Sequence, residues 1–152
     1  MTFKEIKPED FKKVVDLLAE SELDISDLKQ PCIRLFQIGE NGQIAGVGGL
    51  EIYGNQALLR SVAVRKEFQG QGIGKKLVRQ VEEVAIQSGI KSLYLLTTTA
   101  SVFFQSLGYI PINRDDFAEP LKNTAQFAGL CPASAVCMNK ELNTGYQQNY
   151  IS

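Results

Sequence analysis

Apolar residues recur along the chain with two different spacings, which predict strands and helices in alternation. Runs rich in β-branched and aromatic residues, bounded by turn residues, predict strands. These strands are expected at residues 3–6, 32–38, 43–53, 56–64, 92–97, 109–112 and 135–139. Apolar stripes with helical spacing predict helices from Pro8 onward, from about Ile73 to Gly89, and at residues 100–107. This order of elements indicates a mixed α/β fold.

Two short turn signals connect neighbouring strands. Asn41-Gly42 separates the second and third strands, and Gly54-Asn55 separates the third and fourth. An Asn-Gly pair favours a tight β-hairpin, because both residues tolerate a positive φ. Residues 32–64 are therefore predicted to form three consecutive antiparallel strands.

Three glycines, Gly70, Gly72 and Gly74, lie between the fourth strand and the helix that follows it. Without a Cβ, glycine lets the backbone turn sharply and approach a ligand closely. The first turn of the helix also presents unpaired N–H groups and the positive end of the helix dipole. The segment therefore predicts a phosphate-binding loop.

The spacing of this loop excludes two common phosphate-binding motifs. A P-loop requires glycine at position 69 and Ser or Thr at position 76, where this chain has Gln69 and Lys76. A dinucleotide-binding fingerprint requires its third glycine three residues after the second, and an acid at the end of the next strand. Here the third glycine comes two residues after the second, and the next strand ends in threonines at positions 97–99.

Composition narrows the classes of partner. The 152-residue chain is expected to form a single domain over residues 1–142, followed by a polar, flexible tail at 143–152. Its formal net charge of -1 gives no electrostatic reason to bind nucleic acid or an anionic membrane. No apolar run has the length of a membrane span, so we expect a soluble, cytoplasmic protein. The chain has no histidine, the commonest metal ligand, and no metal is expected.

The three cysteines, Cys32, Cys131 and Cys137, are expected to be reduced thiols, because cytoplasmic proteins rarely keep disulfides. Cys137 falls in a predicted strand, where a small buried hydrophobic residue is the usual explanation. Cys131, in the run Leu-Cys-Pro-Ala-Ser, is a candidate for lining a substrate pocket.

Two motifs carry a family resemblance. Gln69, Gly72 and Gly74 fit the pattern Gln/Arg-x-x-Gly-x-Gly/Ala, which resembles the pyrophosphate loop of the GNAT (Gcn5-related) N-acetyltransferases. The segment from Thr97 to Tyr109 resembles that family's Asn-x-x-Ala-x-x-(apolar)-Tyr-x-x-x-Gly-Phe motif, and the order of elements resembles the family over nearly the whole chain. More narrowly, residues 95–100, 103–108 and 124–135 resemble the arsenic-resistance N-acetyltransferase subgroup.

The resemblance implies an acyl-CoA N-acyltransferase fold of the α/β (α+β) class. In that fold a mixed, mostly antiparallel sheet of six to seven strands carries helices on both faces. The resemblance also implies acetyl-CoA as cosubstrate. The implied acetyl-CoA-binding residues are Val62, Ala63, Val64, Gln69, Gly70, Gln71, Gly72, Ile73, Gly74, Lys75, Thr97 and Phe104.

Acetyl transfer to an amine also needs a group that removes the amine proton. Glu51, an acid within an apolar strand, is the first candidate; alternatively it faces solvent and pairs with Arg60 across the hairpin. Arg60 is a candidate for binding a substrate carboxylate, and Thr98 and Cys131 are further substrate-binding candidates. Phe104 stands where many relatives carry a Tyr near the leaving sulfur, so no proton donor is expected there.

These implications favour an enzyme that transfers an acetyl group from acetyl-CoA to the amine of a small, amino-acid-like molecule, in resistance to arsenic or another toxic compound. Direct arsenite binding by the three cysteines is disfavoured, because acetylating an amine requires no thiol. Two alternatives stay open, a protein N-acetyltransferase and a non-catalytic acetyl-CoA-binding sensor. We expect a monomer or a homodimer.

Overall fold

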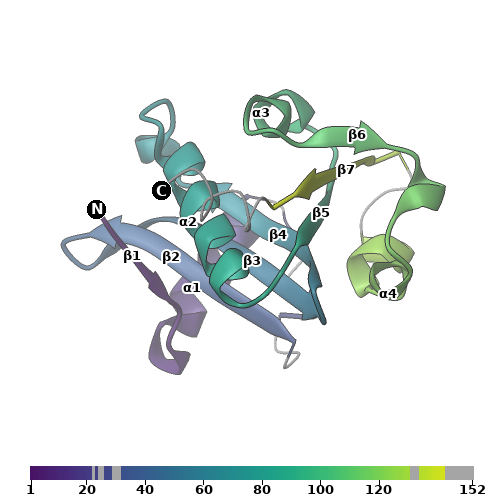
Figure 1. Ribbon diagram of the computed structural model, residues 1–152. Coiled ribbons are helices and arrows are strands. Elements are labelled where there is room, and N and C mark those ends of the chain that lie inside the picture. The colour runs from purple at the N-terminus through teal and green to yellow at the C-terminus, as the bar shows by residue number, and fades with distance from the viewer. Residues whose placement is uncertain (22, 24–25, 29–31, 131–133, 143–152) are drawn as a thin grey trace, which may run out of the picture. The chain divides into compact units, whose positions relative to one another are not determined.

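The computed structural model describes residues 1–21, 23, 26–28, 32–130 and 134–142 (Figure 1). Its strands are β1 (Thr2–Glu5), β2 (Ile33–Glu40), β3 (Gln43–Tyr53), β4 (Gln56–Val64), β5 (Ser92–Thr97), β6 (Ile110–Ile112) and β7 (Val136–Glu141). Its α-helices are α1 (Phe11–Glu20), α2 (Ile73–Gln87), α3 (Ser101–Ser106) and α4 (Glu119–Lys122). Among the described residues, no helix has both the length and the apolarity needed to cross a membrane.

The strands are hydrogen-bonded in the order β1-β2-β3-β4-β5-β7-β6, giving a seven-stranded sheet. The pairs β1–β2, β2–β3, β5–β7 and β6–β7 are antiparallel. β4 and β5 run parallel, with Gln56–Leu58 paired to Ser92–Tyr94. The predicted mixed, mostly antiparallel sheet is therefore confirmed.

Two compact units divide the chain. The first comprises Met1–Glu51 and Leu59–Glu83, and the second comprises Ile52–Leu58 and Val84–Ser152. β4 and α2 contribute residues to both units. The predicted tail at residues 143–152 lies outside the described residues.

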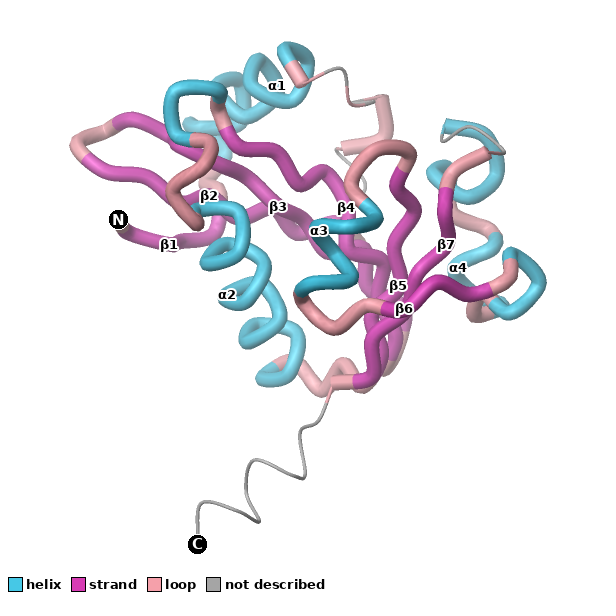
Figure 2. Tube along the Cα trace, turned by 90° about the horizontal axis from the view of Figure 1, so that it is seen from above, coloured by secondary structure: helices cyan, strands magenta, loops and turns pink. Residues whose placement is uncertain are grey.

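In the first unit, α1 and α2 cover opposite faces of β2, β3 and β4 (Figures 1 and 2). Gly48 of β3 lies under α2: a Cβ built there would be in ordinary van der Waals contact with Val81, 3.6 Å away. On the other face, apolar residues of α1 and the strands form a buried cluster. This cluster contains Val14, Leu17, Leu18, Leu28, Leu35, Ile44, Val47 and Ala63. Helices on both faces of the sheet are therefore confirmed.

The hairpin between β2 and β3 has the predicted turn. Asn41 and Gly42 both have positive φ, 53° and 75°, as a type I′ turn requires. The first helix differs from the prediction, because Pro8–Asp10 forms a 3-10 turn and the α-helix begins at Phe11.

In the second unit, β7 lies between β5 and the edge strand β6. The connection from β6 to β7 was not predicted to hold helices, yet it contains a 3-10 turn at Arg114–Asp116, α4, and a π-helix at Gln126–Leu130. Apolar residues of this connection pack on the strands in a second buried cluster. Its buried members are Leu58, Phe117, Leu121 and Cys137.

Candidate functional site

The glycine loop joins β4 to α2 within the first unit. Gly70 and Gly72 both have a φ of +79°, a left-handed conformation that favours glycine. Among the described residues, no atom lies within 4 Å of a Cβ built at either position. The loop therefore leaves open space beside its backbone at the two positions where a side chain would stand.

α2 begins directly after this loop, at Ile73. Its first turn closes with a 3.1 Å hydrogen bond from the Lys76 N–H to the Gly72 carbonyl. The N–H groups of Ile73, Gly74 and Lys75 precede that bond, and helix geometry leaves them without intrahelical acceptors. The first turn of α2, which the structure describes in full, contains no acidic residue. This helix end favours an anionic ligand.

The side chains of Gln69 and Gln71 hydrogen-bond to the backbone of the segment that precedes the loop. The Gln69 side-chain amide donates a 3.0 Å hydrogen bond to the carbonyl of Val64. The Gln71 side-chain amide donates a longer one, 3.4 Å, to the carbonyl of Glu67. The structure thus brings two of the predicted residues, Gln69 and Val64, into direct contact.

Val62 and Val64 are half-buried in the last part of β4, and Ala63 between them is buried. Just before them, Ser61 has a φ of +57° inside the strand. This conformation is costly for a residue with a Cβ, and such strain concentrates at functional sites. Ser61 was not predicted from the sequence, because no residue type around it signals an irregular strand.

Arg60 is enclosed by two acids in the interior of the first unit. Its Nη1 and Nη2 donate 2.6 Å hydrogen bonds to Oδ2 and Oδ1 of Asp27, and Nη1 donates a 2.9 Å bond to Oε1 of Glu51. The side chains of Arg60 and Glu51 are only 2% and 1% exposed. Burial disfavours the charge of Arg60, but the hydrogen bonds and attraction of Asp27 and Glu51 outweigh it and raise the pKa of the guanidinium.

The contacts in this cluster bear on the roles expected of Glu51 and Arg60. The alternative for Glu51 was a side chain in solvent that pairs with Arg60. The pairing is present, but Glu51 is buried, so the pair lies in the interior. Arg60 was expected to bind a substrate carboxylate with both nitrogens, and its bidentate partner is Asp27 of this chain. Asp27 was not found from the sequence, because it is 33 residues away from Arg60 along the chain and only the fold brings the two together.

The remaining candidates lie in the second unit. The Thr97 hydroxyl accepts a 3.0 Å hydrogen bond from the Ala100 N–H and so helps to begin α3. Thr98 is exposed in the loop that follows β5. Phe104 is buried, and its ring meets the ring of Tyr109 edge-on with 5.6 Å between centroids. Cys131 lies outside the described residues.

Two of the three cysteines, Cys32 and Cys137, lie among the described residues. Cys137 is buried in β7, where burial raises the pKa of its thiol. Cys32 and Cys137 make no disulfide with a described residue. Within the described part of the chain, no cluster of Cys, Asp or Glu has the arrangement of a metal site.

Relatives with similar sequences include proteins named as acetyltransferases. Over 91 residues, the chain is 33% identical to an uncharacterised N-acetyltransferase of Chlorobaculum tepidum, covering 59% of this chain and 58% of that protein. It is 27% identical over 117 residues to an amino-acid acetyltransferase of Aeromonas salmonicida, covering 71% of this chain and 26% of that protein. The chain therefore spans less than two thirds of each of these relatives.

Solved structures share the fold. N-acetylglutamate synthase from Neisseria gonorrhoeae, crystallised with coenzyme A and L-arginine, superposes with a TM-score of 0.78 at 16% identity. That superposition covers 93% of this chain and 33% of the synthase chain. Residues 2–109, which include the glycine loop and α2, match the model of the acetyltransferase (GNAT) family, and the chain belongs to that family.

Proposed function

We propose that this protein is an acetyl-CoA-dependent N-acetyltransferase that acetylates the amine of a small, amino-acid-like molecule. The observation that carries the proposal is the glycine loop, with open space beside Gly70 and Gly72 and the start of α2 directly after it. Membership of the family and the amino-acid acetyltransferase among the relatives support the choice of reaction and acceptor.

The loop fits the pyrophosphate of acetyl-CoA in shape and in charge. The unpaired N–H groups at the start of α2 would hold the phosphate oxygens, and exposed Lys75 adds a positive charge nearby. Gln69, bonded to Val64, acts by fixing the course of the loop. When bound, acetyl-CoA supplies an activated acetyl group as a thioester.

The strand before the loop is proposed to bind the rest of the cosubstrate. The backbone of Val62, Ala63 and Val64 would pair with the pantetheine arm, as the resemblance implies. The left-handed conformation of Ser61 supports this role, since it interrupts the regular strand directly before these residues. Thr97 and Phe104 stay proposed acetyl-CoA contacts, as the resemblance implies.

We assign the removal of the amine proton to Glu51. Its side chain is 1% exposed, so the carboxylate would act through an intervening water rather than by direct contact. Arg60 is proposed to orient the Glu51 carboxylate through its 2.9 Å hydrogen bond, which replaces direct binding of the acceptor by Arg60. Thr98 and Cys131 remain proposed acceptor contacts.

The domain bounds, the cellular compartment and the class of acceptor are proposed from the sequence. We propose that both compact units belong to one acetyltransferase domain over residues 1–142, and that the protein acts in the cytoplasm. The resemblance of residues 124–135 to the arsenic-resistance subgroup motivates toxic amino-acid-like compounds as acceptors.

The test is release of free CoA when the protein is mixed with acetyl-CoA and candidate acceptors. The panel contains free amino acids, simple alkylamines, and a peptide with an exposed N-terminus. Acceptor-dependent CoA release with a free amino acid supports the proposal. CoA release with the peptide alone would favour a protein acetyltransferase. If acetyl-CoA binds but no acceptor causes CoA release, a non-catalytic sensor would be favoured.

A further inference from the structure

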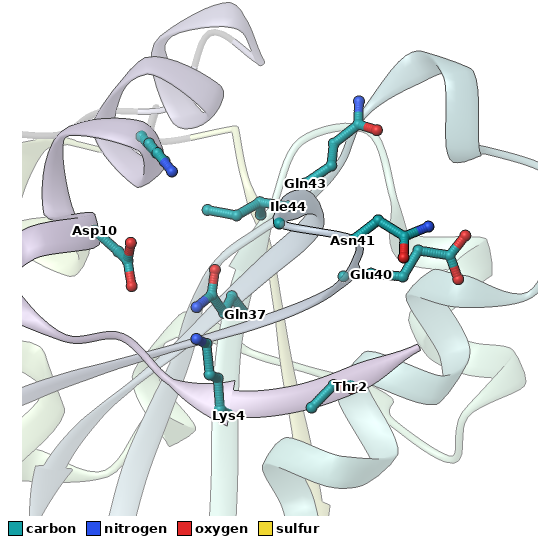
Figure 3. A pocket seen from close by; sticks show the side chains of 11 residues that line it. Thr2, Lys4, Asp10, Gln37, Glu40, Asn41, Gln43 and Ile44 are labelled. Carbon is teal, nitrogen blue, oxygen red and sulfur yellow. The ribbon is translucent and has the colours of Figure 1, made fainter.

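The first unit contains a hollow that no residue of the glycine loop lines. It has a volume of about 340 Å³ and is formed by β1, the hairpin between β2 and β3, and the start of α1 (Figure 3). This volume is within the range of sites for small molecules. None of the residues assigned to acetyl transfer lines this hollow.

Neighbouring strands bring Lys4 and Gln37 together on its floor. They are directly opposite each other in the antiparallel pair of β1 and β2, so their side chains share one face of the sheet. Asp10, at the start of α1, points into the hollow from the other side, whereas Glu40, Asn41 and Gln43 point away from Gln37 (Figure 3).

Gln37 is the most telling of these residues. It is only 6% exposed, and its side-chain amide makes no hydrogen bond to another described residue. Among the buried polar side-chain atoms that the structure describes, only Oε1 of Gln80 lacks a partner, so the Gln37 amide keeps accessible surface on the side of the hollow. Gln37 can both donate and accept, and it lines the hollow, so a ligand there could satisfy both ends.

Opposite charges face the same space without meeting each other. Lys4 and Lys13 supply two positive charges and Asp10 supplies a negative one, whereas Glu40 lines the rim and points away from Gln37. None of the four forms an ion pair with another described residue. A hollow that carries unpaired charges of both signs is complementary to a ligand that also carries both.

We propose that this hollow binds a small zwitterion, such as a free α-amino acid. Lys4 binds the carboxylate, Asp10 binds the ammonium group, and the Gln37 amide hydrogen-bonds to the head group between them. The proposal goes beyond acetyl transfer, because it assigns a ligand site to residues that have no part in holding acetyl-CoA or the acceptor amine.

The test is a titration of the ¹⁵N-labelled full chain with L-serine in the absence of CoA. The reporter is the pair of Gln37 side-chain amide resonances, assigned by their loss in Gln37→Leu. We expect a saturable shift of this pair. Ethanolamine lacks the carboxylate and L-lactate lacks the ammonium group, so each should bind about tenfold more weakly.

Matched variants locate the site. Lys4→Gln and Asp10→Asn should each weaken L-serine binding about tenfold, since each removes one charged hydrogen-bonding group. Lys12→Gln and Asp16→Asn change the same charges on exposed positions of α1 outside the hollow, and they should bind as the parent does. Gly72→Glu should also bind L-serine normally, which separates this site from the cosubstrate loop.

Three outcomes would overturn the proposal. The first is the absence of a saturable shift at Gln37 with L-serine. The second is binding of ethanolamine or L-lactate as tightly as L-serine, which would show that only one charge is recognised. The third is an equal loss of affinity in Lys12→Gln and Lys4→Gln, which would point to a nonspecific charge effect.

Discussion

Asp27 and Arg60 are joined by two hydrogen bonds of 2.6 Å, although they are 33 residues apart in the chain. Glu51 adds a third bond of 2.9 Å to the same guanidinium. One positive group therefore neutralises two acids in the interior of the first unit. If the guanidinium is lost, two like charges remain buried together, which is costly.

Arg60→Gln should lower the free energy of unfolding by about 3–5 kcal/mol, because it leaves both carboxylates without their partner. Asp27→Asn should cost less, since Arg60 and Glu51 still balance each other. The control is Arg34→Gln, which breaks the ion pair with Glu5 between side chains that are 36% and 48% exposed. That variant should lose at most about 1 kcal/mol. Urea denaturation provides the comparison, and equal losses for the two arginines would refute the role of burial.

Gly72→Glu should abolish CoA binding, because it places a carboxylate in the space proposed for the pyrophosphate. Its matched control is Gly72→Gln, which has nearly the same size and the same backbone strain of about 1–2 kcal/mol at positive φ. Calorimetry with CoA should show a much greater loss for Glu than for Gln. Equal affinities in two folded variants would mean that the loop does not hold an anion.

Glu51→Gln should lower kcat/KM while leaving CoA affinity unchanged, because it removes the proposed proton acceptor but keeps an oxygen for Arg60 to bond. The loss should shrink as pH rises and more of the acceptor amine is already deprotonated. A pH profile of kcat/KM measures this. A deficit of the same size at every pH would instead indicate that Glu51 only supports the structure.

Phe104→Leu should keep most of the turnover, because a phenyl ring has no proton to give to the leaving thiolate. The variant will lose some stability, since Phe104 is buried against Tyr109. Turnover should therefore be measured at a temperature where circular dichroism shows both proteins folded. A loss of about 10² or more in a folded variant would contradict the assignment, since that is the size of a proton-transfer effect.

Stability should fall in alkali partly through Cys137. Burial raises the pKa of this thiol above its ordinary value of 9.0, so above that pH the unfolded chain loses the proton while the folded chain keeps it. The stability that the protonated thiol contributes is complete below pH 9.0 and decreases as pH rises above it. Cys137→Ala should show a shallower decline as pH rises above 9.0, in urea denaturation under reducing conditions. Parallel declines would mean that other groups, such as Tyr94, carry the effect.

Local patterns were sufficient to predict much of the fold. β3, β4 and β5 begin and end at the predicted residues, because their apolar runs stop at turn residues that interrupt any strand. The turn at Asn41 and Gly42 followed from two residues that tolerate positive φ. The glycine loop was found from spacing alone, since its conformation depends on residues that are adjacent in the chain.

Features that depend on distant residues were not predictable in this way. Nothing in the neighbourhood of Asp27 indicates that it meets Arg60, and without Asp27 the burial of Glu51 could not be inferred. The helical turns between β6 and β7 are short, and they form where Phe117 and Leu121 pack on the strands rather than where the sequence strongly favours a helix.

The conformation of Ser61 restricts how this position can vary in nature. A strand such as β4 ordinarily accepts Val, Ile or Thr, but a β-branched side chain is strongly disfavoured at a φ of +57°. Glycine, asparagine and aspartate tolerate that backbone best. Selection at position 61 therefore acts on the shape of the main chain, and genetic drift there should be confined to a few small or amide-bearing residues even where neighbouring strand positions change freely.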